Sequence, residues 1–294
     1  MKKEYVYAMI SILLWSTTST ITKLLLKNLD SMQILLISSF FAFIFLFIVN
    51  IFKGYLKELK NYTIKDYSEI AILGTLGTFL YNLFLYLGIN TLQASQAFIL
   101  NYLWPIMIVI FACLILKEKI TKRKIIAILL SFAGVILVTT NGDICNVEIN
   151  SIIGMIYCIL AAVSYGLFSV LNKKKNYNNY VSMMLFYFTS FCISLIYSLI
   201  TKKIFIPEFN QLLGLLWRGV FTCAIAFTSW AIALKEGNTT KISNLAYITP
   251  FISLVWTSMI LKENIKISSI VGLIIIILGI FIQMNNKKDM YKTN

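Results

Sequence analysis

The sequence predicts an all-α membrane protein: ten transmembrane helices arranged as two inverted five-helix repeats, with both termini in the cytoplasm. Two features of composition indicate this class, since 59% of the 294 residues are hydrophobic and only 13% are charged. An ordinary soluble domain is about 25% charged and 45–50% apolar. The third feature is that the apolar residues form blocks of about 20, the length that crosses the roughly 30 Å hydrocarbon core of a bilayer.

Polar breaks divide the chain into ten apolar segments, and each is expected to be one transmembrane helix. The first segment is not interpreted as a cleaved signal peptide, because its apolar stretch continues past the polar run Ser16–Thr20 to Leu26. The loops between the segments are short and leave no room for a soluble domain. The ten segments lie near 5–26, 32–52, 68–89, 94–116, 124–141, 151–171, 181–201, 212–234, 243–261 and 266–284.

The basic residues indicate how the chain is oriented. With the N-terminus in the cytoplasm, the 26 Lys and Arg residues divide into 19 inside and seven outside, as the positive-inside rule requires. Lys23 and Arg218 are among the seven counted on the outside. Most of the net charge of +14 therefore reports topology, helped by anionic lipid at the inner leaflet, and nucleic-acid binding is not expected.

The second half of the chain repeats the first. Ile-Leu-Lys-Glu at 115–118 aligns with the same four residues at 260–263, and Pro105 aligns with Pro250. Each copy holds five segments, and because five is odd, the second copy enters the membrane from the opposite side. Inverted repeats are typical of transporters, whose halves expose a central site to each face in turn. The expected organisation is a first repeat at 1–141, an extracytoplasmic linker at 142–150, a second repeat at 151–284 and a cytoplasmic tail at 285–294.

These motifs resemble a known family. Trp15-Ser16, a proline inside the fourth segment of each half, Leu-Lys-Glu closing that segment, and a glycine in each fifth segment (Gly134, Gly279) resemble the drug/metabolite transporter superfamily, in its EamA-type ten-span branch. The run Asn101–Pro105, with Leu14–Thr17 upstream, is similar to bacterial aromatic amino acid exporters of that superfamily. The resemblance implies an inner-membrane protein that exports Phe, Tyr and Trp by alternating access. The spacing between the third and fourth segments is shorter here than in those exporters.

Polar and aromatic side chains inside the segments are the candidates for a binding site. Pro105 and Pro250 each remove a backbone donor and kink a helix, and matching breaks in two halves point to the substrate region. Asn101 and Trp104 share a helix face, and Asn101 either holds a neighbouring helix or contacts substrate. Any single aromatic is better explained by helix packing or an interface belt, and only the clustering of aromatics with Asn and Pro favours a binding site. The candidates for substrate binding are Trp15, Ser16, Asn101, Tyr102, Trp104, Tyr165, Trp230, Asn244 and Tyr247.

The side chains that most catalytic and metal sites need are missing or scattered. The chain has no His, and its five Cys lack Cys-x-x-Cys spacing, so no metal, cofactor or enzymatic reaction is expected. No Asp or Glu lies near the middle of a segment, which favours a facilitator with a neutral, aromatic-lined passage over a proton-coupled carrier. The expected partners are a small-molecule substrate and membrane lipid. Two other functions stay open: a permease for another metabolite or for organic-cation drugs, and a lipid scramblase, which needs a lipid-facing polar groove.

Overall fold

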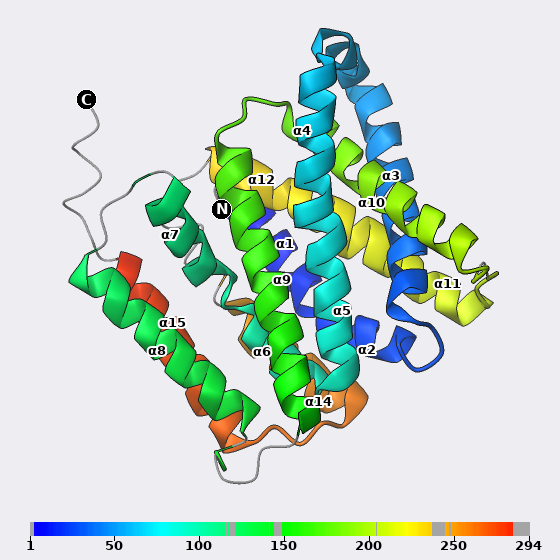
Figure 1. Ribbon diagram of the computed structural model, residues 1–294. Helices are drawn as coiled ribbons and strands as arrows, with labels where there is room; N and C mark the ends of the chain where they lie inside the picture. The colour runs from blue at the N-terminus through cyan, green and yellow to red at the C-terminus, as the bar shows by residue number, and fades with distance from the viewer. Residues whose placement is uncertain are drawn as a thin grey trace.

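The computed structural model describes residues 3–115, 117, 121–140, 142–143, 149–203, 205–236, 245–246 and 248–284, and it contains only helices and turns within these ranges (Figure 1). Seven helical stretches are long and apolar enough to cross a membrane, and three shorter apolar helices lie at Ile128–Val138, Ile248–Leu261 and Ile267–Gly279. The chain is therefore an all-helical, multi-pass membrane protein. The number of ten spans and the cytoplasmic position of the termini stay predictions.

Most of the apolar segments correspond to one or two helices in the structure. The α-helices are α1 Lys3–Ser16, α2 Thr18–Leu25, α3 Ser31–Lys53, α4 Ile64–Gly74, α5 Tyr81–Thr91, α6 Ala94–Asn101, α7 Trp104–Ile115, α8 Lys122–Thr139, α9 Ile149–Lys173, α10 Asn179–Ile200, α11 Phe209–Leu216, α12 Ala226–Glu236, α14 Ile248–Leu261 and α15 Ile267–Met284. A 3-10 helix, η1 Tyr55–Asn61, follows α3. Two π-helical stretches, η2 Thr75–Leu80 and η3 Trp217–Ile225, join α4 to α5 and α11 to α12.

Local sequence explains several helix ends. Asp30 and Gln33 form a capping box that starts α3, since each side chain accepts a backbone N–H of the other residue. Gly54 ends α3 in a left-handed conformation with φ of 69°, which glycine adopts without strain. Thr63 and Asp66 form a second capping box at the start of α4.

The packing has the symmetry that two inverted copies require. Helix α3 packs on α10, so the second segments of the two halves pair with each other. Helix α8 packs on α15, so the fifth segments also pair with each other. The contact of α5 with α9 has its counterpart in the contact of α12 with α1 (Figure 1). Small residues allow α8 and α15 to approach closely: a Cβ added at Gly134 would lie 2.7 Å from the carbonyl oxygen of Gly272.

Two of the membrane-spanning stretches are interrupted near the middle of the molecule. Helix α1 ends at Ser16 and α2 begins at Thr18, within the span Lys3–Leu25. Helix α6 ends at Asn101 and α7 begins at Trp104, immediately before Pro105. Pro250 lies in the first turn of α14. Interrupted helices leave backbone groups unpaired, and transporters use such breaks to build binding sites.

Candidate functional site

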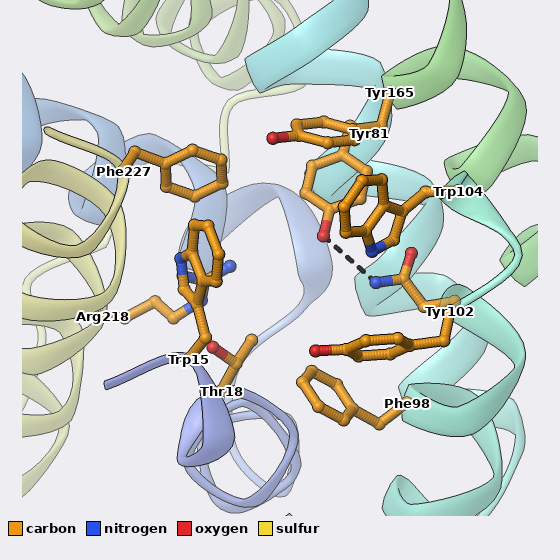
Figure 2. Close-up of a pocket in the computed structure, with 10 residues that line it drawn as sticks. Trp15, Thr18, Tyr81, Phe98, Tyr102, Trp104, Tyr165, Arg218 and Phe227 are labelled. Carbon is orange, nitrogen blue, oxygen red and sulfur yellow. Dashed lines mark hydrogen bonds between the residues drawn. The ribbon is translucent and has the colours of Figure 1, made fainter. Parts of the chain in front are cut away.

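A cavity lies beside the breaks in the two interrupted spans (Figure 2). Seven of its ten lining residues are aromatic. Figure 2 shows Trp15 and Phe227 on one side of the cavity, with Tyr102 and Phe98 opposite them. The cavity measures about 40 Å³, and since one water needs about 10–15 Å³ by this measure, it holds a few waters. Its lining residues are Trp15, Thr18, Tyr81, Phe98, Asn101, Tyr102, Trp104, Tyr165, Arg218 and Phe227.

The aromatic rings of this cavity pack on one another at tilted and edge-on angles. The ring centroids of Trp15 and Phe227 are 5.0 Å apart at 69°, and those of Trp104 and Tyr165 are 5.4 Å apart at 84°. Tyr81 and Tyr165 lie 4.9 Å apart. Edge-to-face pairs each stabilise the packing by about 0.5–1.5 kcal/mol beyond their buried area. These contacts therefore hold the aromatic side chains of the cavity wall in fixed orientations. The arrangement suits an apolar, planar group that can replace one of these ring contacts.

Asn101 and Tyr102 add hydrogen-bonding groups to the cavity. The Asn101 side-chain N–H donates to the Tyr81 hydroxyl at 3.1 Å, the dashed line in Figure 2. The Asn101 Oδ1 is buried and has no hydrogen-bond partner within the described residues, so an acceptor is left open. The Tyr102 hydroxyl donates to the Ala246 carbonyl at 3.0 Å and ties α6 to the residues before α14.

Arg218 differs from its predicted position and from the predicted character of the site. The positive-inside rule places Arg218 on the outer side of the membrane, but it lies near the centre of the candidate span Phe209–Trp230 and is 2% exposed. It also lines the cavity, so this aromatic cavity is not neutral, in contrast to the passage that the sequence predicts. The sequence does contain a signal for this position, because Arg218 is a lone arginine inside the apolar segment 212–234. The positive-inside count treats it as a loop residue and so does not use that signal. A charged side chain at that depth indicates a functional site.

Three neutral side chains hold the Arg218 guanidinium. Its Nη2 donates to Asn82 Oδ1 at 2.7 Å, and its Nη1 donates to the Thr222 hydroxyl and to Cys223 Sγ. The guanidinium also lies over the ring of Tyr86, 5.3 Å from its centroid. Asn82 and Tyr86 lie on α5, and Arg218 and Thr222 belong to η3, so α5 and the π-helical stretch η3 together build this part of the site. π-Helical turns are frequent at functional sites.

The structure brings together five of the nine substrate-binding candidates: Trp15, Asn101, Tyr102, Trp104 and Tyr165 line the cavity. Ser16 does not line it, because its hydroxyl oxygen accepts the Trp256 side-chain N–H at 3.1 Å and joins α1 to α14. Trp230 packs on Trp15 and lines a neighbouring cavity. Asn244 and Tyr247 lie outside the described residues. The sequence alone does not predict the other five lining residues, and of these only Arg218 has a distinguishing signal in the sequence. These five are Thr18, Tyr81, Phe98, Arg218 and Phe227.

A larger neighbouring cavity of about 320 Å³ shares Trp104, Tyr165 and Phe227 with the first. It reaches Asn172 and Lys173 at the end of α9, and Asn179 and Ser182 at the start of α10. A third cavity, of about 580 Å³, lies at the same end of the bundle and is lined by Tyr7, Lys53 and Tyr180, among others. This end, which we name the α9–α10 end, is therefore hollowed as far as the aromatic cavity.

The turn at the α9–α10 end is fixed to α4. The Lys175 ammonium pairs with the Glu69 carboxylate, and the Tyr177 hydroxyl donates to the same carboxylate at 2.9 Å. Burial raises the pKa of the Tyr177 hydroxyl, and the bonded carboxylates of Glu69 and Asp66 raise this pKa further. Tyr177 therefore stays protonated and remains a hydrogen-bond donor across the physiological pH range.

At the opposite end of the bundle, two side chains of opposite charge bind backbone groups at helix ends. The Lys23 ammonium donates to the carbonyls of Ile89 and Leu92 at 2.6 and 2.7 Å. The Glu263 carboxylate accepts the backbone N–H groups of Ala94 and Ser95 at 2.7 and 3.0 Å. Lys23 thus caps the end of α5 and Glu263 caps the start of α6, where each charge complements the helix dipole. We name this the α5–α6 end.

Comparison with known proteins agrees with this architecture. The model of the EamA-like transporter family matches residues 2–140 and 152–284. A protein of Clostridium kluyveri described as an uncharacterized transporter is 28% identical over 299 residues, which cover 98% of this chain and 95% of that one. Another uncharacterized transporter, from Acidianus ambivalens, is 29% identical over 68% of this chain and 78% of its own. A crystal structure with 18% identity shares the fold at a TM-score of 0.69, covering 95% of this chain and 96% of that one.

Proposed function

Since this chain belongs to the EamA-like transporter family of the drug/metabolite transporter superfamily, we propose that it is an exporter of aromatic amino acids in the bacterial inner membrane. The observation that carries the proposal is the aromatic cavity at the helix breaks, where seven of ten lining side chains are aromatic. Stacking and edge contacts with these rings suit an indole or phenyl side chain. The resemblance of the run Asn101–Pro105 to aromatic amino acid exporters supports the same substrate class.

The proposed mechanism is alternating access between two related states. In this conformation the α9–α10 end is hollowed to the aromatic cavity, and Lys23 and Glu263 fix the helix ends at the α5–α6 end, which we take as the closed end. The α9–α10 end is the cytoplasmic end in the predicted orientation, so this state would load substrate from the cytoplasm. Because packing contacts in one half have counterparts in the other, exchanging their roles would open the α5–α6 end.

We propose that transport is uncoupled from protons. The chain has no His, and none of the described cavity-lining residues is an Asp or Glu, the groups that usually carry protons in coupled transporters. Arg218 does not serve as such a relay, because an arginine keeps its proton at all physiological pH values.

The main competing function, export of organic cations, is disfavoured by one residue. Aromatic faces attract organic cations, so the rings alone would suit both substrate classes. A buried guanidinium in the same cavity repels a cation across a medium of low dielectric constant. A permease for another metabolite remains the second candidate.

Uptake of labelled Phe, Tyr and Trp into proteoliposomes tests the proposal, with Leu and Lys as non-aromatic comparisons. We expect saturable uptake of the aromatic amino acids and mutual competition among them. Phe227→Ala removes one cavity wall and should lower the apparent affinity, whereas Phe52→Ala, at a position 86% exposed, is the matched control and should leave it unchanged. If aromatic amino acids neither move nor compete, the proposed substrate class is wrong.

A further inference from the structure

Arg218 is a buried cation that has no carboxylate partner within the described part of the chain. Its guanidinium contacts an amide oxygen, a hydroxyl and a thiol, which belong to Asn82, Thr222 and Cys223. Neutral dipoles of this kind stabilise a buried charge without neutralising it. Since placing an arginine at the centre of a membrane is costly, a residue that serves only packing is a poor explanation for Arg218.

The hydrogen bonds of Arg218 leave donors open. A guanidinium has five N–H groups. Nη1 donates to Thr222 and Cys223. Nη2 carries two hydrogens but makes one hydrogen bond, to Asn82, so one of its hydrogens is left over. The Nε–H is buried and has no partner among the described residues. Arginine binds a carboxylate through two such N–H groups at once, so the open donors match that group in number and charge.

The surroundings of Arg218 favour an anion in the same cavity. Trp104, the first residue of α7, lines the cavity, so the positive end of the α7 dipole lies beside it. Figure 2 shows Arg218 behind Trp15, on the side of the cavity opposite Tyr102 and Phe98. The apolar rings between them exclude water and so strengthen the attraction between the guanidinium and an anion.

We propose that Arg218 is the anion-binding group of this cavity and that the transported molecule carries a carboxylate, which the open N–H groups of Arg218 bind. The aromatic walls then hold the apolar part of the same molecule. In an amino acid, the ammonium group would be bound by Asn101 Oδ1, the buried acceptor that has no partner among the described residues. This inference rests on the proposed function only in taking the cavity as the transport site, and it does not require an aromatic substrate.

The test compares ligands that differ only in the carboxylate. The full-length protein in detergent is titrated with 3-phenylpropionate and with its neutral amide, and in a second pair with phenylalanine and phenylalaninamide. Affinity is measured from the ligand-induced rise in the thermal unfolding midpoint. We expect each acid to bind at least about tenfold more tightly than its amide, as for a hydrogen bond between charged groups.

Variants then assign the preference to one side chain. In Arg218→Gln the acid and the amide should bind equally, and in Arg218→Lys, which keeps the charge and loses the fork of donors, part of the preference should remain. Arg123→Gln is the matched control, because Arg123 is the only other arginine of the chain and does not line the cavity, so the preference should be unchanged. If Arg218→Gln does not fold, the wild-type ligand pairs and Arg218→Lys decide the question.

The outcomes separate this inference from the proposed function. Equal binding of acid and amide by the wild-type protein, or an undiminished preference in a folded Arg218→Gln protein, would overturn the role of Arg218 and leave aromatic transport standing. Binding of short alkyl carboxylates but of no aromatic compound, lost in Arg218→Gln, would overturn the aromatic substrate class and support the anion-binding role.

Discussion

Replacing Asn82 with aspartate is expected to keep the protein folded and to remove its recognition of carboxylates. The change is one atom in size. The Oδ1 that accepts from Arg218 at 2.7 Å stays in place, while the Nδ2 that donates to the Thr78 carbonyl at 2.7 Å becomes a second carboxylate oxygen. Both side chains are buried, Asn82 at 1% and Arg218 at 2% exposure. The variant therefore supplies the guanidinium with a permanent counter-ion from within the protein.

The buried position of Asn82 beside Arg218 sets the size of two effects, the change in protein stability and the change in affinity for a carboxylate. An ion pair at about 4 Å with an effective dielectric constant near 20 is worth about 4 kcal/mol, and the cost of burying the new carboxylate offsets much of this gain. The lost bond to Thr78 costs about 1 kcal/mol, so the thermal midpoint should move by only a few degrees. A bound carboxylate would face the new charge at roughly 5 Å, a repulsion of about 3 kcal/mol, which weakens binding on the order of a hundredfold.

The assay is the ligand-induced shift of the thermal midpoint in detergent, with 3-phenylpropionate and its amide. Asn50→Asp is the matched control, because Asn50 is fully buried on α3 and donates to the carbonyls of Leu46 and Tyr180, away from the cavity. That variant should lose stability, since its new charge faces carbonyl oxygens, and it should keep the ligand preference. Carboxylate affinity at the wild-type level in Asn82→Asp would refute the reasoning.

Three further predictions concern the closure of the α5–α6 end, the contact between α8 and α15, and the coupling of transport to protons. Glu263→Gln should weaken the cap on α6 and raise the rate at which a cysteine placed at Thr91 is labelled from the α5–α6 end; an unchanged rate would show that Glu263 does not hold that end closed. Gly134→Leu should lower the thermal midpoint by several degrees, because its Cβ would meet the Gly272 carbonyl oxygen at 2.7 Å and overpacking costs about 1–3 kcal/mol; a wild-type midpoint would mean that α8 and α15 separate freely. An imposed pH gradient should leave the flux of phenylalanine into proteoliposomes unchanged, and a steep dependence would contradict uncoupled transport.

The sequence predicts the helical membrane class because its signal is large and local: long apolar blocks match the thickness of a bilayer. It also identifies the region of the site, since the run Asn101–Pro105 that it singled out contains the end of α6, the start of α7 and three residues of the cavity lining. Composition could not separate Tyr81 or Phe98 from the other aromatic residues of the chain, because their position in the cavity depends on how helices pack.

The position of Arg218 was predicted wrongly for a different reason. The positive-inside count treats each basic residue as a loop residue, so an arginine inside a span is assigned to whichever side balances the count. Its partners, Asn82 and Thr222, are polar residues common in membrane helices, and nothing in the sequence relates Asn82 to Arg218. Only the tertiary structure brings α5 and η3 together, and so only it makes the charge part of a site.

The π-helical winding of η3 determines which side chains share the cavity. Arg218 and Phe227 are nine residues apart, which is two and a half turns of a regular α-helix of 3.6 residues per turn, so in such a helix they would point in opposite directions. Both line the cavity because the intervening residues wind more widely, with the Ala226 N–H donating back five residues to the Phe221 carbonyl. The position of the Arg218 charge in the cavity therefore depends on the winding of the helix as much as on the residue type. Substitutions that restore regular α-helical winding in η3 at unchanged length would therefore turn Arg218 away from Phe227 and change the specificity of the site without replacing any residue that lines it.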